Sequence, residues 1–161
     1  MATPTNLPPS FSVGQFNTAA LMNGLRGAFR ILQVVEGTTT AVVGNSTTGF
    51  ADTNLTASIT PQSTSSKVLV IYSQNCYSTG GTTGMALRLL RGATTLDTIY
   101  DLVYGTNSGL LAHETFTYLD SPASSSSVTY KTQFNRNSGG GIVYVQPNSN
   151  RSSMLLFEVS A

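Results

Sequence analysis

The last third of the chain alternates between short apolar segments and breaks made of Ser, Gly, Asn or Pro, and this alternation restricts the fold more than any other feature. Each apolar segment has the length of a β-strand. Within residues 128–134, Val128, Tyr130, Thr132 and Phe134 occupy every second position. Successive side chains of a strand point to opposite sides of a sheet, so this segment is expected to bury one face and expose the other.

Similar signals continue upstream, and the whole chain from residue 27 onward is expected to be all-β. Short strands with turn residues between them are typical of a sandwich or barrel. We therefore expect a jelly-roll-like sandwich of eight strands with one or two more. The expected strands are Phe29–Glu36, Thr39–Val43, Leu55–Thr60, Lys67–Asn75, Met85–Arg91, Thr95–Tyr100, Leu111–Leu119, Val128–Asn135, Ile142–Gln146 and Met154–Val159.

Residues 1–26 differ in composition from the β domain at 27–161. Residues 1–12 are rich in Pro, Thr and Asn, which favours an extended arm. Asn17 or Thr18 can cap a short helix that continues towards Leu25. Apolar side chains in this arm have little reason to lie in a solvated tail, so they are the candidate attachment residues: Phe11, Phe16, Leu21, Met22 and Leu25.

Two of the expected strands are apolar on both faces. Residues 68–72 read Val-Leu-Val-Ile-Tyr, and residues 154–157 read Met-Leu-Leu-Phe. A continuous apolar run without alternation is typical of a strand that is buried on both faces. Ordinary packing in the centre of the core is one explanation. A second covering surface, most simply another subunit, is the other.

Composition argues against several classes of function. Charged residues make up 9% of the chain, and the net charge is +1, whereas a typical soluble domain has about 25% charged residues. With no basic patch to neutralise phosphates, we expect no nucleic-acid partner. No stretch approaches the ~20 apolar residues of a membrane-spanning helix. Cys76 is the only cysteine, which rules out an intramolecular disulfide and favours a buried apolar role.

The residues that carry catalytic chemistry are few and scattered. His113 is the only histidine, and the adjacent Glu114 points to the other face of the strand, which is wrong for a catalytic triad. Glycoside hydrolysis needs two carboxyl groups about 5–10 Å apart in a cleft, yet only Asp97 and Asp101 are near each other in sequence. Asp120, before Ser-Pro, is expected to accept backbone N–H groups in a turn. We expect no enzyme, no cofactor and no metal site.

Several segments resemble the β-structured domain of phage virion proteins, which occurs in tail fibres and in head decoration proteins. They are SITPQSTSSKVLV at 58–70, YLDSPASSSSVTYKTQF at 118–134 and GGIVYV at 140–145. SFSVGQFNTAALMN at 10–23 resembles a short N-terminal element of phage structural proteins, although Phe16 and Asn17 stand where an aliphatic residue is usual. The resemblance implies a virion protein that forms a homotrimer. The first residues have no apolar core of a signal peptide, so we expect synthesis in the host cytoplasm.

Two classes of function follow from this resemblance. The first is a capsid decoration, or cement, protein that binds the major capsid protein or another virion protein through its arm. The second is a short tail fibre or receptor-binding protein whose loops contact a host surface glycan. A lectin-like binding module outside a virion is a weaker third option. The short arm favours the first class, because fibre proteins usually carry a long shaft before the tip.

Overall fold

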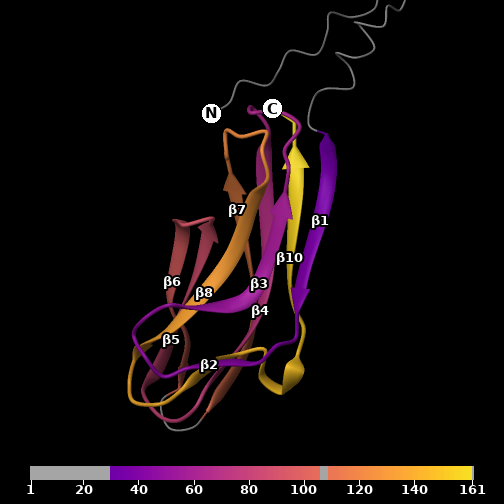
Figure 1. The fold of residues 1–161 in the computed structure, drawn as a ribbon. Coiled ribbons are helices and arrows are strands. Elements are labelled where there is room, and N and C mark those ends of the chain that lie inside the picture. Colours follow the sequence, from indigo (N-terminus) through magenta and orange to yellow (C-terminus); the bar gives the residue numbers. More distant parts are fainter. Residues whose placement is uncertain (1–29, 106–108, 161) are drawn as a thin grey trace, which may run out of the picture.

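The computed structural model describes residues 30–105 and 109–160 of the chain, which form two packed antiparallel sheets (Figure 1). The expected helix and arm at residues 1–26 lie outside the described residues. The strands are β1 (Ile31–Thr39), β2 (Val43–Asn45), β3 (Ala51–Ile59), β4 (Lys67–Ser78), β5 (Thr83–Arg91), β6 (Thr94–Gly105), β7 (Leu110–Asp120), β8 (Val128–Ser138), β9 (Val143–Val145) and β10 (Ser152–Val159), with one 3₁₀ turn, η1 (Pro147–Ser149).

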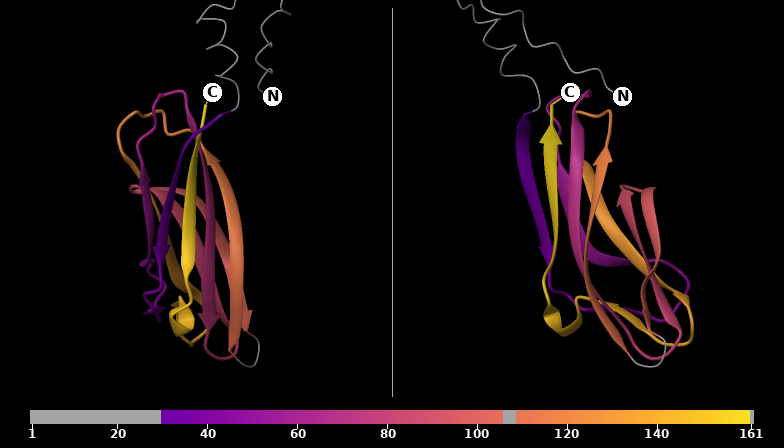
Figure 2. Two further views of the ribbon diagram at one scale, coloured as in Figure 1. Left: turned by 90° about the vertical axis from the view of Figure 1, so that its right-hand side faces the viewer. Right: turned by 180° about the vertical axis from the view of Figure 1, so that it is seen from behind.

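The larger sheet is organised around β4, which is twelve residues long. One side of β4 pairs with β10 and then with β9, and its other side pairs with β7 along the whole length of that strand. Strand β1 extends the sheet beyond β10, and β2 extends it beyond β9. The smaller sheet has the order β3-β8-β5-β6. The eight long strands are thus divided into two layers in a jelly-roll-like order, as Figure 2 shows.

Nine of the ten expected strands are present, and the expected all-β sandwich is confirmed for the described residues. The strand expected at Thr39–Val43 is displaced, because residues 40–42 connect β1 to the short β2. Strand β6 extends five residues beyond the expected end at Tyr100, and β8 extends three beyond Asn135. Turn residues were therefore better guides to the existence of strands than to their ends.

The core lies between the inner faces of the two sheets. Alternation along β3, β4, β8 and β10 supplies most of it, and its largest fully buried side chains include Tyr72, Tyr130, Phe134, Leu87 and Leu156. Cys76 is also fully buried, as expected, and burial raises the pKa of its thiol to about 12. The thiol therefore stays protonated and acts as a small apolar group.

Asp120 does not act as a turn acceptor, and that expectation is wrong. The residue is the last of β7, and its buried carboxylate lies 2.8 Å from Arg91 Nη1 of β5. The hydroxyl of Tyr130 in β8 donates to Asp120 Oδ2 at 2.6 Å. This cluster therefore joins the larger sheet to two strands of the smaller one.

Candidate assembly surface

The outer face of the larger sheet carries a row of apolar side chains across four strands. Val34 of β1 pairs with Phe157 of β10, Phe157 with Leu69 of β4, and Leu69 with Leu119 of β7. Val34 is 52% exposed and Leu119 is 55% exposed, although both are large apolar residues. The smaller sheet packs on the opposite face, so in the described part of the chain these side chains face away from the core.

A second row strengthens the apolar character of this surface. Two residues further along each strand, Leu155 of β10 pairs with Ile71 of β4. Glu36 of β1 and Thr117 of β7 stand at the two ends of this second row. We call the two rows the assembly face: Val34, Phe157, Leu69, Leu119, Leu155 and Ile71. Contiguous exposed apolar patches on a soluble domain commonly mark an interaction site.

The assembly face explains why two strands do not alternate in sequence. Their inner residues Val70 and Leu156 are fully buried, while the outer neighbours Ile71 and Leu155 are only partly buried. The sequence therefore correctly indicated two apolar faces on β4 and β10. The inner face of each strand packs in the core, and the outer face carries residues of the assembly face.

The same surface becomes polar further along the sheet, around His113. The Nδ1 atom of His113 lies 2.8 Å from Asn75 Oδ1, and its Nε2 atom lies 2.8 Å from Ser73 Oγ. This Asn–His–Ser order resembles the spacing of a nucleophile, a base and an orienting group. However, Ser73 sits in the central strand and pairs with Ser153 on one side and Thr115 on the other. Its backbone is engaged in the ladder and offers no oxyanion donors.

Sequence reasoning compared His113 only with Glu114, its neighbour in the chain, and missed Ser73 and Asn75. These partners arise from the register that sets Asn75 opposite His113. No local signal encodes that register. The polar run Ser-Gln-Asn at residues 73–75, after the apolar half of β4, is the only trace of this cluster in the sequence.

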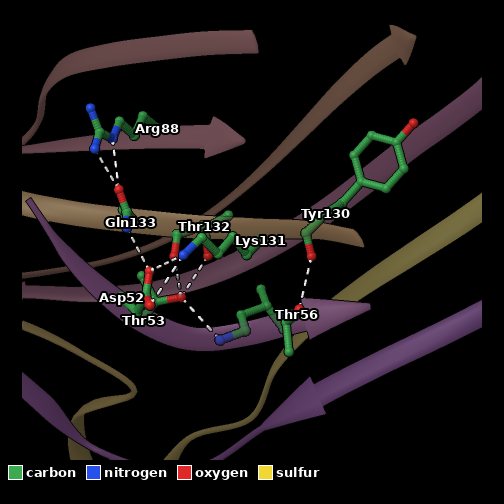
Figure 3. Close-up of polar contacts among 9 residues, drawn as sticks. Asp52, Thr53, Thr56, Arg88, Tyr130, Lys131, Thr132 and Gln133 are labelled. Carbon is green, nitrogen blue, oxygen red and sulfur yellow. Dashed lines mark hydrogen bonds and ion pairs between the residues drawn. The ribbon is translucent and has the colours of Figure 1, made fainter. Parts of the chain in front are cut away.

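A second polar cluster lies on the smaller sheet (Figure 3). Gln133 accepts from Arg88 Nε at 3.0 Å and donates to Asp52 Oδ1 at 2.6 Å, and Lys131 Nζ lies 2.9 Å from the same carboxylate oxygen. The hydrogen bond from Lys131 is the main cause of the lowered pKa of Asp52, and it outweighs the effect of burial. The cluster is thus a surface network in which Arg88, Asp52 and Lys131 all have polar partners.

Beside this network, a bulge in β3 opens a shallow pocket. Asp52 pairs with Gln133, but the next pair is Thr56 with Lys131, so three residues of β3 oppose one of β8. Asn54 in the bulge has a φ of 64°. The pocket has a volume of about 220 Å³, which is below the range of about 300–1,000 Å³ typical of ligand sites for drug-sized molecules.

The candidate attachment residues Phe11, Phe16, Leu21, Met22 and Leu25 lie outside the described residues. The described chain begins at Arg30, whose backbone N–H donates to Ser160 Oγ at 3.1 Å and whose carbonyl accepts from Ser160 N at 3.0 Å. The described chain thus begins beside the end of β10, where β1 also starts (Figure 1).

Within 30–105 and 109–160, no three or more His, Cys, Asp or Glu side chains gather into a possible metal site. In the same residues, no helix is long and apolar enough to span a membrane.

No protein-family model matches the chain, and no curated protein matches it. Among solved structures, a Stig cyclase from Fischerella sp. TAU is 16% identical with a TM-score of 0.40, over 73% of this chain and 61% of that one. The CBM36-1 domain of a xylanase from the hindgut metagenome of Trinervitermes trinervoides is 11% identical with a TM-score of 0.41, over 77% and 96%.

The VP2 subviral particle of infectious bursal disease virus is 14% identical with a TM-score of 0.39, over 81% of this chain and 38% of that one. The chain therefore spans less than two thirds of both the cyclase and the VP2 chain. At these TM-scores, none of the three assigns a function to the protein.

Proposed function

We propose that the protein is a structural component of a phage virion, and specifically a capsid decoration protein that acts as a homotrimer. The assembly face is the observation that carries this proposal. A face with two rows of partly exposed apolar side chains gains free energy when a partner covers it. The sequence segments that resemble phage virion proteins indicate the kind of particle.

The chemistry of the assembly face suits a permanent contact between copies of this chain. Full burial of a Val, Leu, Ile or Phe side chain contributes about 1.5–3 kcal/mol, and six such residues form the face. Glu36 is the one charged residue in its two rows, and Arg151 Nη1 lies 3.7 Å from it. The contact should therefore depend little on salt.

We expect Val34→Lys and Leu119→Lys, each tested alone, to convert the trimer into monomers. Each change places a charge in the apolar row, where burial without a partner is unfavourable. Sedimentation at micromolar concentration measures the result. Val42→Lys is the matched control, because Val42 is a 49% exposed valine in the connection before β2.

Three outcomes would contradict this interface. The wild-type protein could sediment as a monomer, or both lysine variants could sediment like the Val42→Lys control. A trimer that dissociates between about 0.1 and 1 M salt would also contradict it, because exposed charge pairs are screened in that range. Circular dichroism of each variant separates lost association from lost folding.

Attachment to the particle is assigned to the arm, through Phe11, Phe16, Leu21, Met22 and Leu25. Its partner is the major capsid protein or another virion protein. A cement protein that binds only the assembled lattice stabilises each site by RT ln(1 + [L]/Kd), about 2.7 kcal/mol at a hundredfold excess over Kd. Trimeric avidity increases the occupancy of such sites.

Phage that encode the chain without residues 2–26 are expected to assemble particles that lack the protein and break at lower temperature. These particles should adsorb to cells at the normal rate, because a cement protein does not contact the host. Particle heat resistance, adsorption rate and protein content are the three measurements. The truncated protein, purified separately, should remain a folded β domain.

The alternative function is a short tail fibre or receptor-binding protein. The pocket beside Asp52 and Asn54 favours it, since a carboxylate, an amide and nearby hydroxyls are suitable partners for the hydroxyls of a glycan. Particles that keep their heat resistance but lose adsorption would support this alternative. Full occupancy of particles by the truncated protein would contradict the role of the arm under either function.

A further inference from the structure

Three side-chain oxygen atoms converge at the end of the smaller sheet where β8 ends and β5 begins. They are Asp101 Oδ1 of β6, Asn137 Oδ1 of β8 and Ser138 Oγ of β8. All three lie within 2.9 Å of the position that a Cβ atom on Gly84 of β5 would occupy. A Cβ atom at position 84 would occupy this space and displace the three side chains, so glycine allows their oxygens to approach one another.

A bulge in β6 brings the carboxylate of Asp101 to this point. Met85 pairs with Val103 and Leu87 pairs with Ile99, so residues 100–102 lie opposite a single residue of β5. Asp101 adopts a φ of 52°, a left-handed conformation that is uncommon for residues other than glycine. The amide nitrogen of Asn137 donates to Asp101 Oδ1 at 2.7 Å and fixes the carboxylate next to β8.

Among residues 30–105 and 109–160, two of the three oxygens are buried without a hydrogen-bond partner. They are Asn137 Oδ1 and Ser138 Oγ. An unsatisfied buried acceptor is costly, and such groups in folded proteins usually contact water or an ion. Here both lie beside a carboxylate, which gives the cluster one negative charge and only hard oxygen ligands.

We propose that this cluster binds a calcium ion through the carboxylate of Asp101, the side-chain carbonyl of Asn137 and the hydroxyl of Ser138. Calcium prefers oxygen ligands and tolerates irregular geometry, and water molecules complete its coordination. One carboxylate provides little charge, so the affinity belongs in the range of about 10⁻⁴–10⁻³ M found for weak extracellular sites. By binding residues of both strands, the ion holds the β6 bulge against the end of β8.

Terbium, a luminescent substitute for calcium, gives a direct readout on the full-length protein. Tyr104 pairs with Gly84 and can sensitise terbium bound at this site. We expect the wild-type protein to give a saturable luminescence signal that calcium displaces, and millimolar calcium to raise the thermal midpoint at constant ionic strength. Asp101→Asn should weaken calcium binding at least tenfold.

The control is Asp97→Asn, which removes an exposed carboxylate from the same strand and should leave terbium binding unchanged. Ser138→Ala removes one oxygen ligand and adds no bulk, so it should weaken binding. Gly84→Ala places a methyl group among the three oxygens, so it should abolish binding. If the two buried oxygens hold only water, calcium will not move the wild-type midpoint, and the proposal is overturned. An equal terbium signal from wild type and Asp101→Asn would overturn it as well.

Discussion

Replacing Asp120 with alanine is expected to lower the free energy of unfolding by about 3 kcal/mol, the lower end of the range for breaking a buried ion pair. The lower end applies because the Arg91 side chain is still 29% exposed, whereas that of Asp120 is 7% exposed. Burial, and then the hydrogen bond to Asp120, raise the pKa of Tyr130, so its hydroxyl stays protonated and donates to the carboxylate. Alanine leaves the Tyr130 hydroxyl without its acceptor and leaves Arg91 Nη1 with only the long hydrogen bond to the Ser121 carbonyl at 3.4 Å.

Thermal unfolding at one fixed protein concentration measures this loss, and the midpoint should fall by roughly 6–12 °C. Asp52→Asn is the matched control. It also removes a carboxylate paired with a cation, but the Asp52 and Lys131 side chains are 53% and 31% exposed, and exposed pairs contribute at most about 1 kcal/mol. Equal losses for Asp120→Ala and Asp52→Asn would contradict a stabilising role for the buried pair of Asp120 and Arg91.

A triple variant separates the ion pair from simple packing. Arg91→Met, Asp120→Leu and Tyr130→Phe together remove every polar member of the cluster and keep its volume. Replacing a whole buried ionic group by apolar residues is often neutral or stabilising. We therefore expect the triple variant to recover most of the stability that Asp120→Ala loses. A triple variant as unstable as Asp120→Ala would show that the polar contacts themselves stabilise the fold, and that unpaired donors are not the cause of the loss in Asp120→Ala.

The strands were predictable because their signals are local. Alternation in β8 and the breaks before and after each segment depend on neighbours in the chain, so a single sequence contains them. The doubly apolar segments of β4 and β10 even indicated the assembly face. Sequence could not reveal which side chains share that face, because the row from Val34 to Leu119 depends on the register of four strands.

The polar clusters were not predictable, for the same reason. Asp120 meets Arg91 and Tyr130 only because the two sheets pack together, and His113 meets Asn75 only through strand register. The oxygens around Gly84 depend on two bulges, one in β6 and one between β5 and β8. Bulges insert unpaired residues and redirect side chains, and the spacing of apolar residues does not report them.

Glu158 is a further buried group that register alone explains. It follows Met154 and Leu156 at every second position of β10, so it faces the core and is fully buried. An irregularity in β1 turns Gln33 towards it, and Gln33 Nε2 donates to Glu158 Oε2 at 2.6 Å. The backbone N–H of Gln62 donates to Glu158 Oε1 at 2.7 Å.

These contacts determine how the carboxyl of Glu158 responds to pH. Burial alone would raise its pKa, but the hydrogen bonds from the Gln33 side chain and the Gln62 backbone favour the ionised carboxylate, and the pKa falls below the ordinary value of 4.5. A carboxyl whose folded pKa is lowered stabilises the fold above its unfolded pKa. The stabilisation is lost as the pH falls through the folded pKa.

Glu158→Gln is therefore expected to lower the free energy of unfolding by about 2 kcal/mol at neutral pH, the middle of the range for hydrogen bonds to a charged group. The difference between wild type and variant should shrink steadily as the pH falls below about 4.5, because wild-type Glu158 becomes protonated there. Denaturant unfolding at a series of pH values measures both. Glu114→Gln, which removes an exposed carboxyl, controls for the change in net charge. A wild-type advantage over Glu158→Gln that grows as the pH falls would show that the carboxyl is held in its protonated form by burial, and would refute the assignment of these hydrogen bonds to the ionised group.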